Sequence, residues 1–473
     1  MIPGAVKIEG VGVLPAQTEG RADVYSDNNY ILAKSKWMPD DEATHCPLCQ
    51  QKFSQLRRKH HCRQCGQVFC SKCCKTNVPL PQLGLENPER VCDGCLPVVE
   101  LVTKSKSPQG SFQSESIQGL LEQIHDSTGL RKVVQLGGVQ AIISLSRSSN
   151  SEVRKKCAEA LHLLAMQEPL HNMLIDAGAI KALCGLLMSA SETDEQLLSY
   201  LIGALMIFAK APHLQMRVVQ DGALPPVLAL CGMNVSEAIA LIAVRTLNLL
   251  MENIGSHTAL IESDRNALPR LLKLTVSMDE QVKLFYISVG TTTGDIRQMQ
   301  EVSLKTLSRL SMGTDYHRHR IVQEDFSAGK CLMKSLQCHP KNLQVLCNAA
   351  CLVANLATSE QDQSSLTECL DALCSLLTKF KEQVDLLVHV IRGLANFASF
   401  HQNVYRLSTN EAVQQHSLRL ILHVLHRSSE QAITALMRDG GADLLRSIAK
   451  TPGMVDAMQA NLRQYVSALS APS

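Results

Sequence analysis

Apolar residues recur with a helical period over most of the chain, from about residue 117 to the end. A step of small residues precedes an apolar run four times in this region, at intervals of 41, 44 and 44 residues. The four steps are Gly137-Gly138-Val139, Gly178-Ala179-Ile180, Gly222-Ala223-Leu224 and Asn266-Ala267-Leu268. The pattern predicts that one helix ends at each small residue and that an apolar helix begins there, in unit after unit.

A second series of positions follows the same rhythm: Ala160-Leu161, Ala204-Leu205, Thr246-Leu247, Thr306-Leu307, Leu352-Val353 and Gly393-Leu394. The intervals are 44, 42, 60, 46 and 41 residues, so one unit is longer than the others. We place its extra residues near Val289–Gln298, where a Gly- and Thr-rich stretch predicts a loop. The basic cluster around Tyr316–Arg320 is interpreted as a second, solvated loop.

The remaining parts of the chain lack this periodicity. Residues 1–35 look irregular, and residues 101–116 are rich in Ser and are predicted to be a flexible linker. Ser107-Pro108 within that linker is either a phosphorylation site or simply linker. Residues 36–100 form a Cys-rich domain, and residues 117–473 form the helical repeats.

Composition excludes several classes of protein. The 473 residues carry a net charge of +2, which gives no chain-wide excess for nucleic acid, and 45% hydrophobic residues are too many for a disordered chain. No run of 18 apolar residues occurs, and the N-terminus lacks the basic start and apolar core of a signal peptide. We therefore expect a cytoplasmic protein with no span across the membrane.

Cysteine is the anomaly of the composition. Nine of the 18 Cys lie between Cys46 and Cys95, and the other nine are scattered from Cys157 to Cys374, where we expect them to fill the helical core. The dense block contains four C-x-x-C pairs: Cys46/Cys49, Cys62/Cys65, Cys70/Cys73 and Cys92/Cys95. Eight thiolates predict two closed, structural Zn²⁺ sites, whereas a redox pair would need an isolated C-x-x-C beside a βαβ pattern. The extra Cys74 is not expected to be a ligand.

The charge around these cysteines is one-sided. From Ala43 to Leu85 there is no Asp or Glu, while seven Lys and Arg side chains occur, so the rest of the chain sums to −5. Zinc thiolates are buried at the metal, whereas Lys and Arg heads point outward. The surface of this domain is therefore predicted to attract an anion.

Three motifs surround the ligands in order: Trp37-Met38-Pro39-Asp40, then Arg58-Lys59-His60-His61-Cys62-Arg63, then Arg90-Val91-Cys92. Because eight Cys already fill two metal sites, the two His are free for another role. With these W-x-x-D, R-[RK]-H-H-C-R and R-V-C motifs, about residues 37–98 resemble the FYVE zinc fingers. The resemblance implies a small cross-braced finger with short β-hairpins and a C-terminal helix.

The resemblance also implies a metal pairing and a ligand. One zinc would be held by Cys46, Cys49, Cys70 and Cys73, and the other by Cys62, Cys65, Cys92 and Cys95. FYVE fingers bind phosphatidylinositol 3-phosphate, so Arg63 and Arg90 would contact the 3-phosphate, and Arg58 and Lys59 the phosphodiester side. Asp40, His60 and His61 would engage ring hydroxyls or the phosphate. Trp37 either contributes to the headgroup site or covers the base of the pocket.

Retention at a membrane needs more than the headgroup. The loop Ser54–Arg57 matches the family's membrane-inserting turret, but Leu56 is its only fully apolar residue. Burial of one Leu contributes roughly 1.5–3 kcal/mol, so insertion is expected to be shallow. We therefore expect avidity, through a homodimer or a membrane-bound protein partner. Protonation of His60 and His61 beside a phosphate should strengthen binding as the pH falls from 8 to 6.

The period and the small-residue steps of the C-terminal region resemble armadillo repeats, which implies an all-α superhelix that binds protein partners in a groove. The family often has a ladder of Asn on its third helix. Here only Asn355 and Asn396 occupy that position, which puts a long peptide-clamping ladder in doubt.

Together these features predict a non-enzymatic adaptor. Its finger would bind phosphatidylinositol 3-phosphate on early endosome membranes, and its helical region would hold a protein partner in trafficking or signalling. The alternative is a RING-like ubiquitin ligase, because RING domains also interleave two zinc ions. The helical region alone would also suit nuclear transport, but the lipid-binding motifs disfavour both alternatives.

Overall fold

A computed structural model describes most of the chain: residues 4–20, 23–27, 29–232, 235–276, 293–337, 342–380, 382–400 and 403. The chain divides into two compact units, Met1–Asp264 and Arg265–Ser473. Each unit has its own packing, and the two are treated one after the other below.

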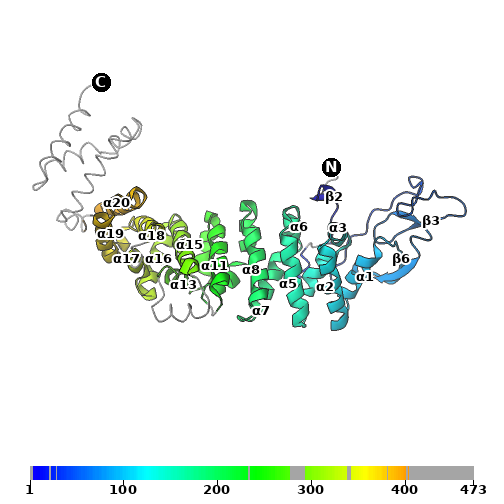
Figure 1. Ribbon diagram of the computed structural model, residues 1–473, viewed down its shortest axis with the longest axis horizontal. Coiled ribbons are helices and arrows are strands. Elements are labelled where there is room, and N and C mark those ends of the chain that lie inside the picture. The colour runs from blue at the N-terminus through cyan, green and yellow to red at the C-terminus, as the bar shows by residue number, and fades with distance from the viewer. Residues whose placement is uncertain are drawn as a thin grey trace, which may run out of the picture. The chain divides into compact units, whose positions relative to one another are not determined.

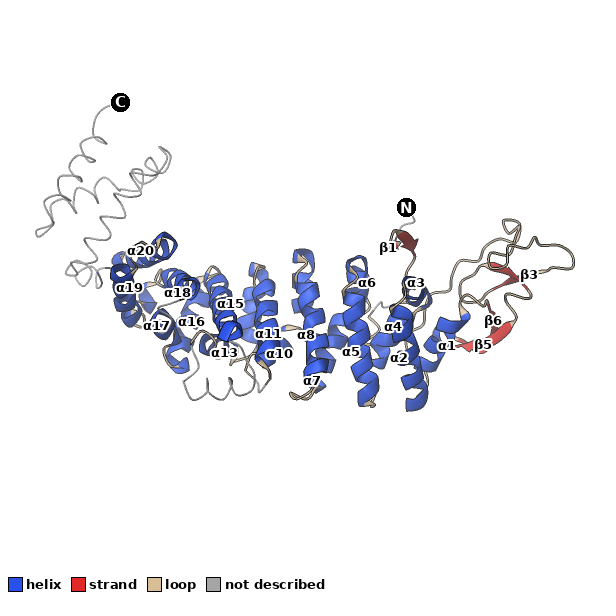
Figure 2. Ribbon diagram, in the orientation of Figure 1, coloured by secondary structure: helices blue, strands red, loops and turns tan. Residues whose placement is uncertain are grey.

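Short antiparallel hairpins open the first unit. In its described residues three two-stranded sheets occur, which pair β1 (Val6–Ile8) with β2 (Val11–Val13), β3 (Lys59–His61) with β4 (Val68–Cys70), and β5 (Thr76–Leu80) with β6 (Leu85–Val91). Helix α1 (Leu96–Ser105) follows the last strand after a turn of residues 92–95. The two later hairpins and α1 form the small finger expected from the sequence, and Figure 2 shows its strands in red beside the blue helices.

Helices in groups of three fill the rest of the first unit. Their bounds are α2 (Gly110–Ile124), α3 (Ser127–Leu136), α4 (Gly138–Leu145), α5 (Ser151–Ala165), α6 (His171–Asp176), α7 (Ala179–Ser189), α8 (Glu195–Ala209), α9 (Gln215–Gln220), α10 (Leu224–Leu230), α11 (Glu237–Leu250) and α12 (His257–Ser263). Short 3₁₀ turns precede α6, α9 and α12. The long helices α2, α5, α8 and α11 pack successively against one another (Figure 1).

The small-residue steps have the predicted role. Gly137 and Gly178 adopt left-handed backbone, with φ of 90° and 95°, between α3 and α4 and between α6 and α7. Only glycine takes this conformation without strain, which explains why it stands where one helix ends and the next begins. Polar caps begin α5 and α8: the side chain of Asn150 accepts a hydrogen bond from the Glu152 amide, and that of Asp194 accepts one from the Leu197 amide.

The second apolar series lies in the core, as stacked repeats require. Leu161, Leu205 and Leu247 are each at most 1% exposed. Five of the scattered cysteines are buried as expected: Cys157, Cys184, Cys231, Cys331 and Cys369. Three others, Cys347, Cys351 and Cys374, are only half-buried, and Cys338 lies outside the described residues.

The second unit continues the repeating pattern. Its described helices are α13 (Ala267–Lys273), α15 (Thr293–Ser311), α16 (Asp315–Ala328), α17 (Cys331–Gln337), α18 (Leu343–Leu356), α19 (Thr367–Lys379) and α20 (Val384–Ala398). The long helices α15, α18 and α20 pack in series, with the shorter ones on their flank. Thr306, Leu307, Leu352 and Leu394 of the second apolar series are buried here as well.

Several expectations about loops are wrong. The segment 101–116, predicted to be a flexible linker, is helical except for residues 106–109, because α1 extends to Ser105 and α2 begins at Gly110. The loop placed near Val289–Gln298 is helical from Thr293 onward, and residues 289–292 lie outside the described residues. Ser and Thr do not prevent helix formation where an amphipathic face can pack.

The basic cluster Tyr316–Arg320 is also not a loop. It lies in the first turns of α16, where His317 is 3% exposed and its Nδ1 accepts a hydrogen bond from the Thr314 amide. His319 lies 2.7 Å from the carboxylate of Asp362, which is 43 positions further along the chain. The stacking of one repeat on the next brings Asp362 to His319. The spacing of residues near His319 in the sequence does not reveal this pair.

The described part of residues 1–35 is attached to the helices. After the β1–β2 hairpin the chain crosses α3, α4 and α7 and makes backbone hydrogen bonds to Val134 and Ala177 before it enters the finger. In the described part of the chain, no single helix is long and apolar enough to cross a membrane. Three helix pairs, each sharply bent at a short break, would reach that length and hydropathy together.

Candidate functional site

The first metal cluster joins two distant C-x-x-C turns. The Sγ atoms of Cys46, Cys49, Cys70 and Cys73 lie within 4.8 Å of one another. Cys46 begins a tight turn in which its carbonyl accepts a hydrogen bond from the Gln50 amide, and Cys70 ends β4. The Cys70 amide donates to the Cys46 Sγ at 3.5 Å, which supports a thiolate at that position.

The second cluster uses the other two pairs. The Sγ atoms of Cys62, Cys65, Cys92 and Cys95 also lie within 4.8 Å of one another. Cys62 follows β3, Cys92 follows β6, and Cys95 caps α1. The first and third pairs thus form one cluster and the second and fourth the other, so the two clusters are cross-braced as the sequence resemblance implied.

Both clusters fit zinc. A tetrahedral ion with Zn–S bonds of about 2.3 Å places its sulfurs about 3.8 Å apart, and the Sγ atoms of Cys49 and Cys70 are 3.7 Å apart. Four thiolates fill the coordination sphere, so these are structural ions with no position for a substrate. Cys74 is buried but belongs to neither cluster, and His60 and His61 belong to neither.

A stack of three side chains stands beside the second cluster. The Trp37 ring stacks on the His61 ring with centroids 4.4 Å apart, and the Arg63 guanidinium lies 5.0 Å from the Trp37 centroid. His61 Nε2 donates a hydrogen bond to the Met38 carbonyl at 2.8 Å. Trp37 therefore orients two basic side chains, and 49% of its own surface stays exposed.

Two arginines come together, Arg63 from the turn after Cys62 and Arg90 from β6. The Arg63 amide donates to the Arg90 carbonyl at 2.9 Å, so their backbones lie side by side. Arg90 donates to the Cys74 carbonyl, and Arg63 donates to the His61 carbonyl. The Arg63 Nε also lies 3.1 Å from Glu89, a partner that the sequence reasoning missed because it considered only the acid-free stretch that ends at Leu85.

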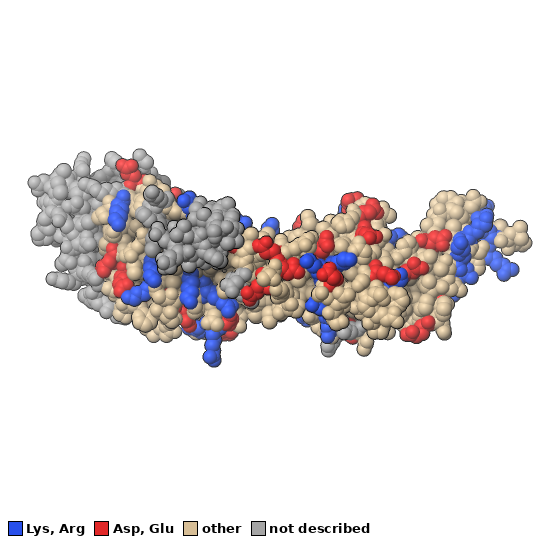
Figure 3. All heavy atoms as spheres, turned by 60° about the horizontal axis from the view of Figure 1, so that its bottom comes forward, with Lys and Arg blue, Asp and Glu red and all other residues tan. Residues whose placement is uncertain are grey.

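The electrostatics around His60 are strongly positive. Burial, followed by the charges of Arg90, Arg58 and Arg63, lowers the pKa of His60. Four predicted site residues therefore share one electrostatic environment. Figure 3 shows Lys and Arg gathered over the finger on the face in view.

The other predicted site residues border this basic surface. Lys59 Nζ donates to the backbone carbonyl of Asp40 at 2.5 Å, while the Asp40 carboxylate lies 3.8 Å from His61 Nε2 and is mostly exposed. Arg58 is exposed. Leu56 stands at the tip of a turn closed by hydrogen bonds between Ser54 and Arg57, and its surface is 100% exposed.

Backbone contacts that the sequence did not reveal hold the Trp37 motif in place. The Met38 amide donates to the Gly66 carbonyl at 3.0 Å, and Ser35 donates to the Gln64 carbonyl. A Cβ on Gly66 would lie 2.4 Å from the Lys36 carbonyl oxygen, and Gly66 has φ of 70°. Glycine is therefore required there. The one available signal was its place in the turn after Cys65.

The two Asn of the predicted partner groove are engaged within the helical region. The Asn355 amide donates to Ser311 Oγ at 2.8 Å, and its oxygen accepts a hydrogen bond from Arg392. The Asn396 amide donates to the Ala354 carbonyl at 2.7 Å. Both side chains thus join neighbouring long helices, and their role toward a partner stays a prediction.

The two interleaved all-Cys clusters, the paired hairpins and the closing helix define a cross-braced zinc finger. Residues 36–100 match the family model described as FYVE zinc finger, so this domain is a FYVE finger. The chain is 40% identical over 88 residues to human RUN and FYVE domain-containing protein 1, covering 19% of this chain and 12% of that protein. It is 45% identical over 60 residues to a Lateral signaling target protein 2 homolog from Brugia malayi, covering 13% and 10%.

The chain therefore spans only a small part of the length of these curated relatives. Among solved structures, a designed armadillo repeat protein in complex with a (KR)4 peptide is similar with a TM-score of 0.42 and 21% identity, covering 54% of this chain and 98% of that one. An engineered protein covers 80% of this chain and 99% of its own, with a TM-score of 0.40 and 21% identity. These scores describe a loose likeness of helical repeats.

Proposed function

We propose that this protein is a non-enzymatic adaptor whose finger binds phosphatidylinositol 3-phosphate on membranes and whose helical region binds a protein partner. The proposal rests on the FYVE finger and on its basic surface. The observation that carries it is the convergence of Arg63, Arg90 and His60 beside an all-cysteine metal cluster. Guanidinium groups form bidentate, charge-assisted hydrogen bonds with a phosphate, which a surface of scattered charge does not provide.

Each predicted residue has a proposed role at the headgroup. Arg63 and Arg90 bind the 3-phosphate, and binding requires Arg63 to share its charge between the phosphate and Glu89. Arg58 and Lys59 face the phosphodiester, while Asp40 accepts hydrogen bonds from ring hydroxyls and repels a phosphate at the wrong position. His60 and His61 complete the site, and Trp37 holds His61 and Arg63 in orientation.

Membrane contact is proposed at the Leu56 turn. Its fully exposed side chain can enter the bilayer and contributes roughly 1.5–3 kcal/mol when buried. This is a weak anchor, so we propose that self-association or a membrane-bound partner adds avidity. The site of action would be the cytoplasmic face of early endosomes, with the protein peripheral on the membrane.

Vesicle sedimentation tests the proposal. Vesicles that contain phosphatidylinositol 3-phosphate should retain the full chain, vesicles with other phosphoinositides should retain less, and Arg63→Ala should lose most of the binding. Lys75→Ala is the matched control, because Lys75 is an exposed cation of the same finger outside the proposed site. Equal binding to all anionic vesicles, or equal losses in both variants, would show a generic basic surface instead.

A further inference from the structure

The N-terminal segment is bound to the helical region like an extended peptide. The Ala16 amide donates to the Val134 carbonyl of α3 at 2.9 Å, and the Ala16 carbonyl accepts from Gln140 Nε2 of α4 at 2.9 Å. Eight residues later the Val24 amide donates to the Ala177 carbonyl at 2.9 Å. Backbone groups of one segment are thus satisfied by α3, by α4 and by Ala177, the residue that caps the end of α6.

The turn Asp23–Ser26 fills a slot on α7. Asp23 forms an ion pair with Lys181 at 2.5 Å, and Val24 is fully buried. The turn lies against two glycines: a Cβ on Gly185 would lie 2.0 Å from Tyr25 Oη, and one on Gly178 would lie 2.4 Å from Asp23 Oδ1 and 3.0 Å from Tyr25 Cβ. The slot exists only because these two positions carry no side chain.

The other end of the same segment is fixed to the finger. Leu32 is buried against Gly137, and its amide donates to the Gln82 carbonyl at 2.7 Å. Lys106 Nζ donates to the Tyr30 carbonyl at 2.8 Å and lies 3.4 Å from the centroid of its ring. The described residues 15–20, 23–27 and 29–33, here called the strap, therefore run from α3 and α4 to α7 and then to the finger.

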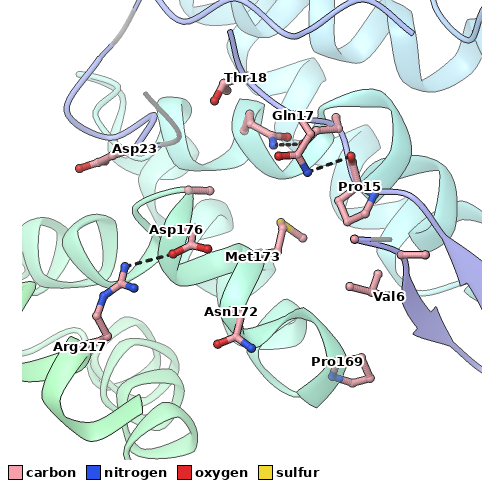
Figure 4. Close-up of a pocket in the computed structure, with 15 residues that line it drawn as sticks. Val6, Pro15, Gln17, Thr18, Asp23, Pro169, Asn172, Met173, Asp176 and Arg217 are labelled. Carbon is pink, nitrogen blue, oxygen red and sulfur yellow. Dashed lines mark hydrogen bonds and ion pairs between the residues drawn. The ribbon is translucent and has the colours of Figure 1, made fainter. Parts of the chain in front are cut away.

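The strap does not pack along its whole length. A cavity of about 720 Å³ separates its Pro15, Gln17 and Asp23 from Asn172, Asp176 and Arg217 of the helices (Figure 4). The strap thus touches the helices at separate points rather than as a continuous core. Such a segment can be released at one point without loss of the helices beneath it.

A second connection ties the finger to the helices independently of the strap. Ser116 of α2 donates to the Leu101 carbonyl of α1 at 2.8 Å, and the Leu101 side chain occupies the space where a Cβ of Gly119 would lie. The finger is therefore held through α1 on one side and through the strap on the other. Helix α1 packs against α2, α3 and α4, and the strap adds a separate attachment.

We propose that the strap is a latch that docks in the α7 slot and holds the finger and the first helical repeats as one body. If the finger binds a membrane lipid as proposed above, the latched state fixes how the helical region is oriented to the bilayer. The latch itself does not depend on that proposed function, because all of its contacts are within the chain.

Gly185→Ala tests the latch because it fills the slot without weakening α7. The new Cβ expels the Tyr25 ring, while alanine inside a helix is more favourable than glycine by about 1 kcal/mol, so α7 itself should not weaken. Gly110→Ala is the matched control, since nothing lies within 4 Å of its Cβ position. Tyr25→Ala is a second variant, which empties the slot without changing α7.

Two readouts on the full chain decide the matter. Hydrogen exchange should show that the Ala16 and Val24 amides lose protection in Gly185→Ala and Tyr25→Ala but not in Gly110→Ala. The single Trp of the chain, Trp37, lies in the finger, so its fluorescence anisotropy should fall in the same two variants as the finger gains motion. Unchanged protection, or lost protection with unchanged anisotropy, would overturn the latch.

Vesicle sedimentation of the same variant distinguishes failure of the latch from failure of the proposed function. Gly185→Ala leaves the proposed headgroup site intact and should sediment with vesicles containing phosphatidylinositol 3-phosphate as the wild type does. If neither protein binds those vesicles, the lipid proposal fails while the exchange and anisotropy results still decide the latch.

Discussion

The zinc finger and the helical repeats are stabilised in different ways. The repeats bury a continuous series of Leu, Val and Ala, including Leu161, Leu205 and Leu247. The finger buries few apolar side chains between its short hairpins, and eight thiolates in two clusters take the place of a core. Small domains with too little apolar surface usually require such metal crosslinks.

This difference leaves the two surfaces free for different tasks. Because metal holds the finger together, cations such as Lys52, Arg58 and Lys75 can stand exposed on its surface without loss of the fold. In the helical region, by contrast, polar side chains such as Asn355 and Asn396 join neighbouring helices. The comparison predicts that either region can be unfolded or destabilised while the other keeps its structure.

Loss of zinc should give the largest effect. Structural zinc contributes about 10–16 kcal/mol of binding free energy in small finger peptides, so Cys92→Ser or a chelator should unfold the finger. Native mass spectrometry should count two zinc ions in the wild type and fewer in Cys92→Ser, and hydrogen exchange should show an intact α18. Cys74→Ala is the control and should keep both ions, whereas loss of zinc from it would make Cys74 a ligand.

A cavity in the helical core should destabilise the helical repeats and leave the zinc sites intact. Leu205 is fully buried, so Leu205→Ala should lower the free energy of unfolding by about 2–5 kcal/mol while the count of zinc ions stays at two. Met188→Ala, at a position that is 70% exposed, should have little effect in the same denaturant titration. A variant that loses helical stability and zinc together would show that the regions are not independent.

A substitution on the surface of the finger should have a smaller effect, on vesicle binding alone. If Arg63 binds the phosphate as proposed, Glu89 competes with that phosphate, and Glu89→Gln should tighten binding to vesicles containing phosphatidylinositol 3-phosphate by roughly two- to fivefold. Glu86→Gln on the same strand removes the same charge away from Arg63 and serves as the control. Weaker binding by Glu89→Gln alone would mean that Glu89 orients Arg63 rather than competing for it.

The last prediction concerns the pH dependence of the junction between the finger and the helical repeats. Burial lowers the pKa of Lys106 from 10.5 to about 8. Between these values the unfolded chain binds more protons than the folded one, so the contribution of Lys106 to stability should rise with pH across this window. Urea unfolding at pH 7.5 and 9.5 gives the free energies of unfolding of the wild type and of Lys106→Met. The difference between them should shift in favour of the wild type at the higher pH. A difference that does not change with pH would contradict this account.

The sequence was most informative where chemistry is local. C-x-x-C spacing indicated the zinc ligands, and the Gly137 and Gly178 steps marked the ends of helices, because each depends on neighbouring residues. The strap and the Arg63–Glu89 pair depend on contacts between distant segments, such as Val24 with Ala177, which no local pattern reveals. The linker prediction failed because a Ser-rich composition was given more weight than the apolar face of α2 that packs on α1.

The central claim is that the finger recognises one phosphoinositide headgroup rather than negative charge in general. Isothermal titration calorimetry of the full chain with short-chain, water-soluble phosphoinositides tests this most directly, because no membrane and no avidity contribute. We predict saturable binding of phosphatidylinositol 3-phosphate, much weaker binding of the 4-phosphate isomer, and loss of the heat signal in Arg63→Ala. Equal affinity for the two isomers, or full binding by Arg63→Ala, would contradict the account.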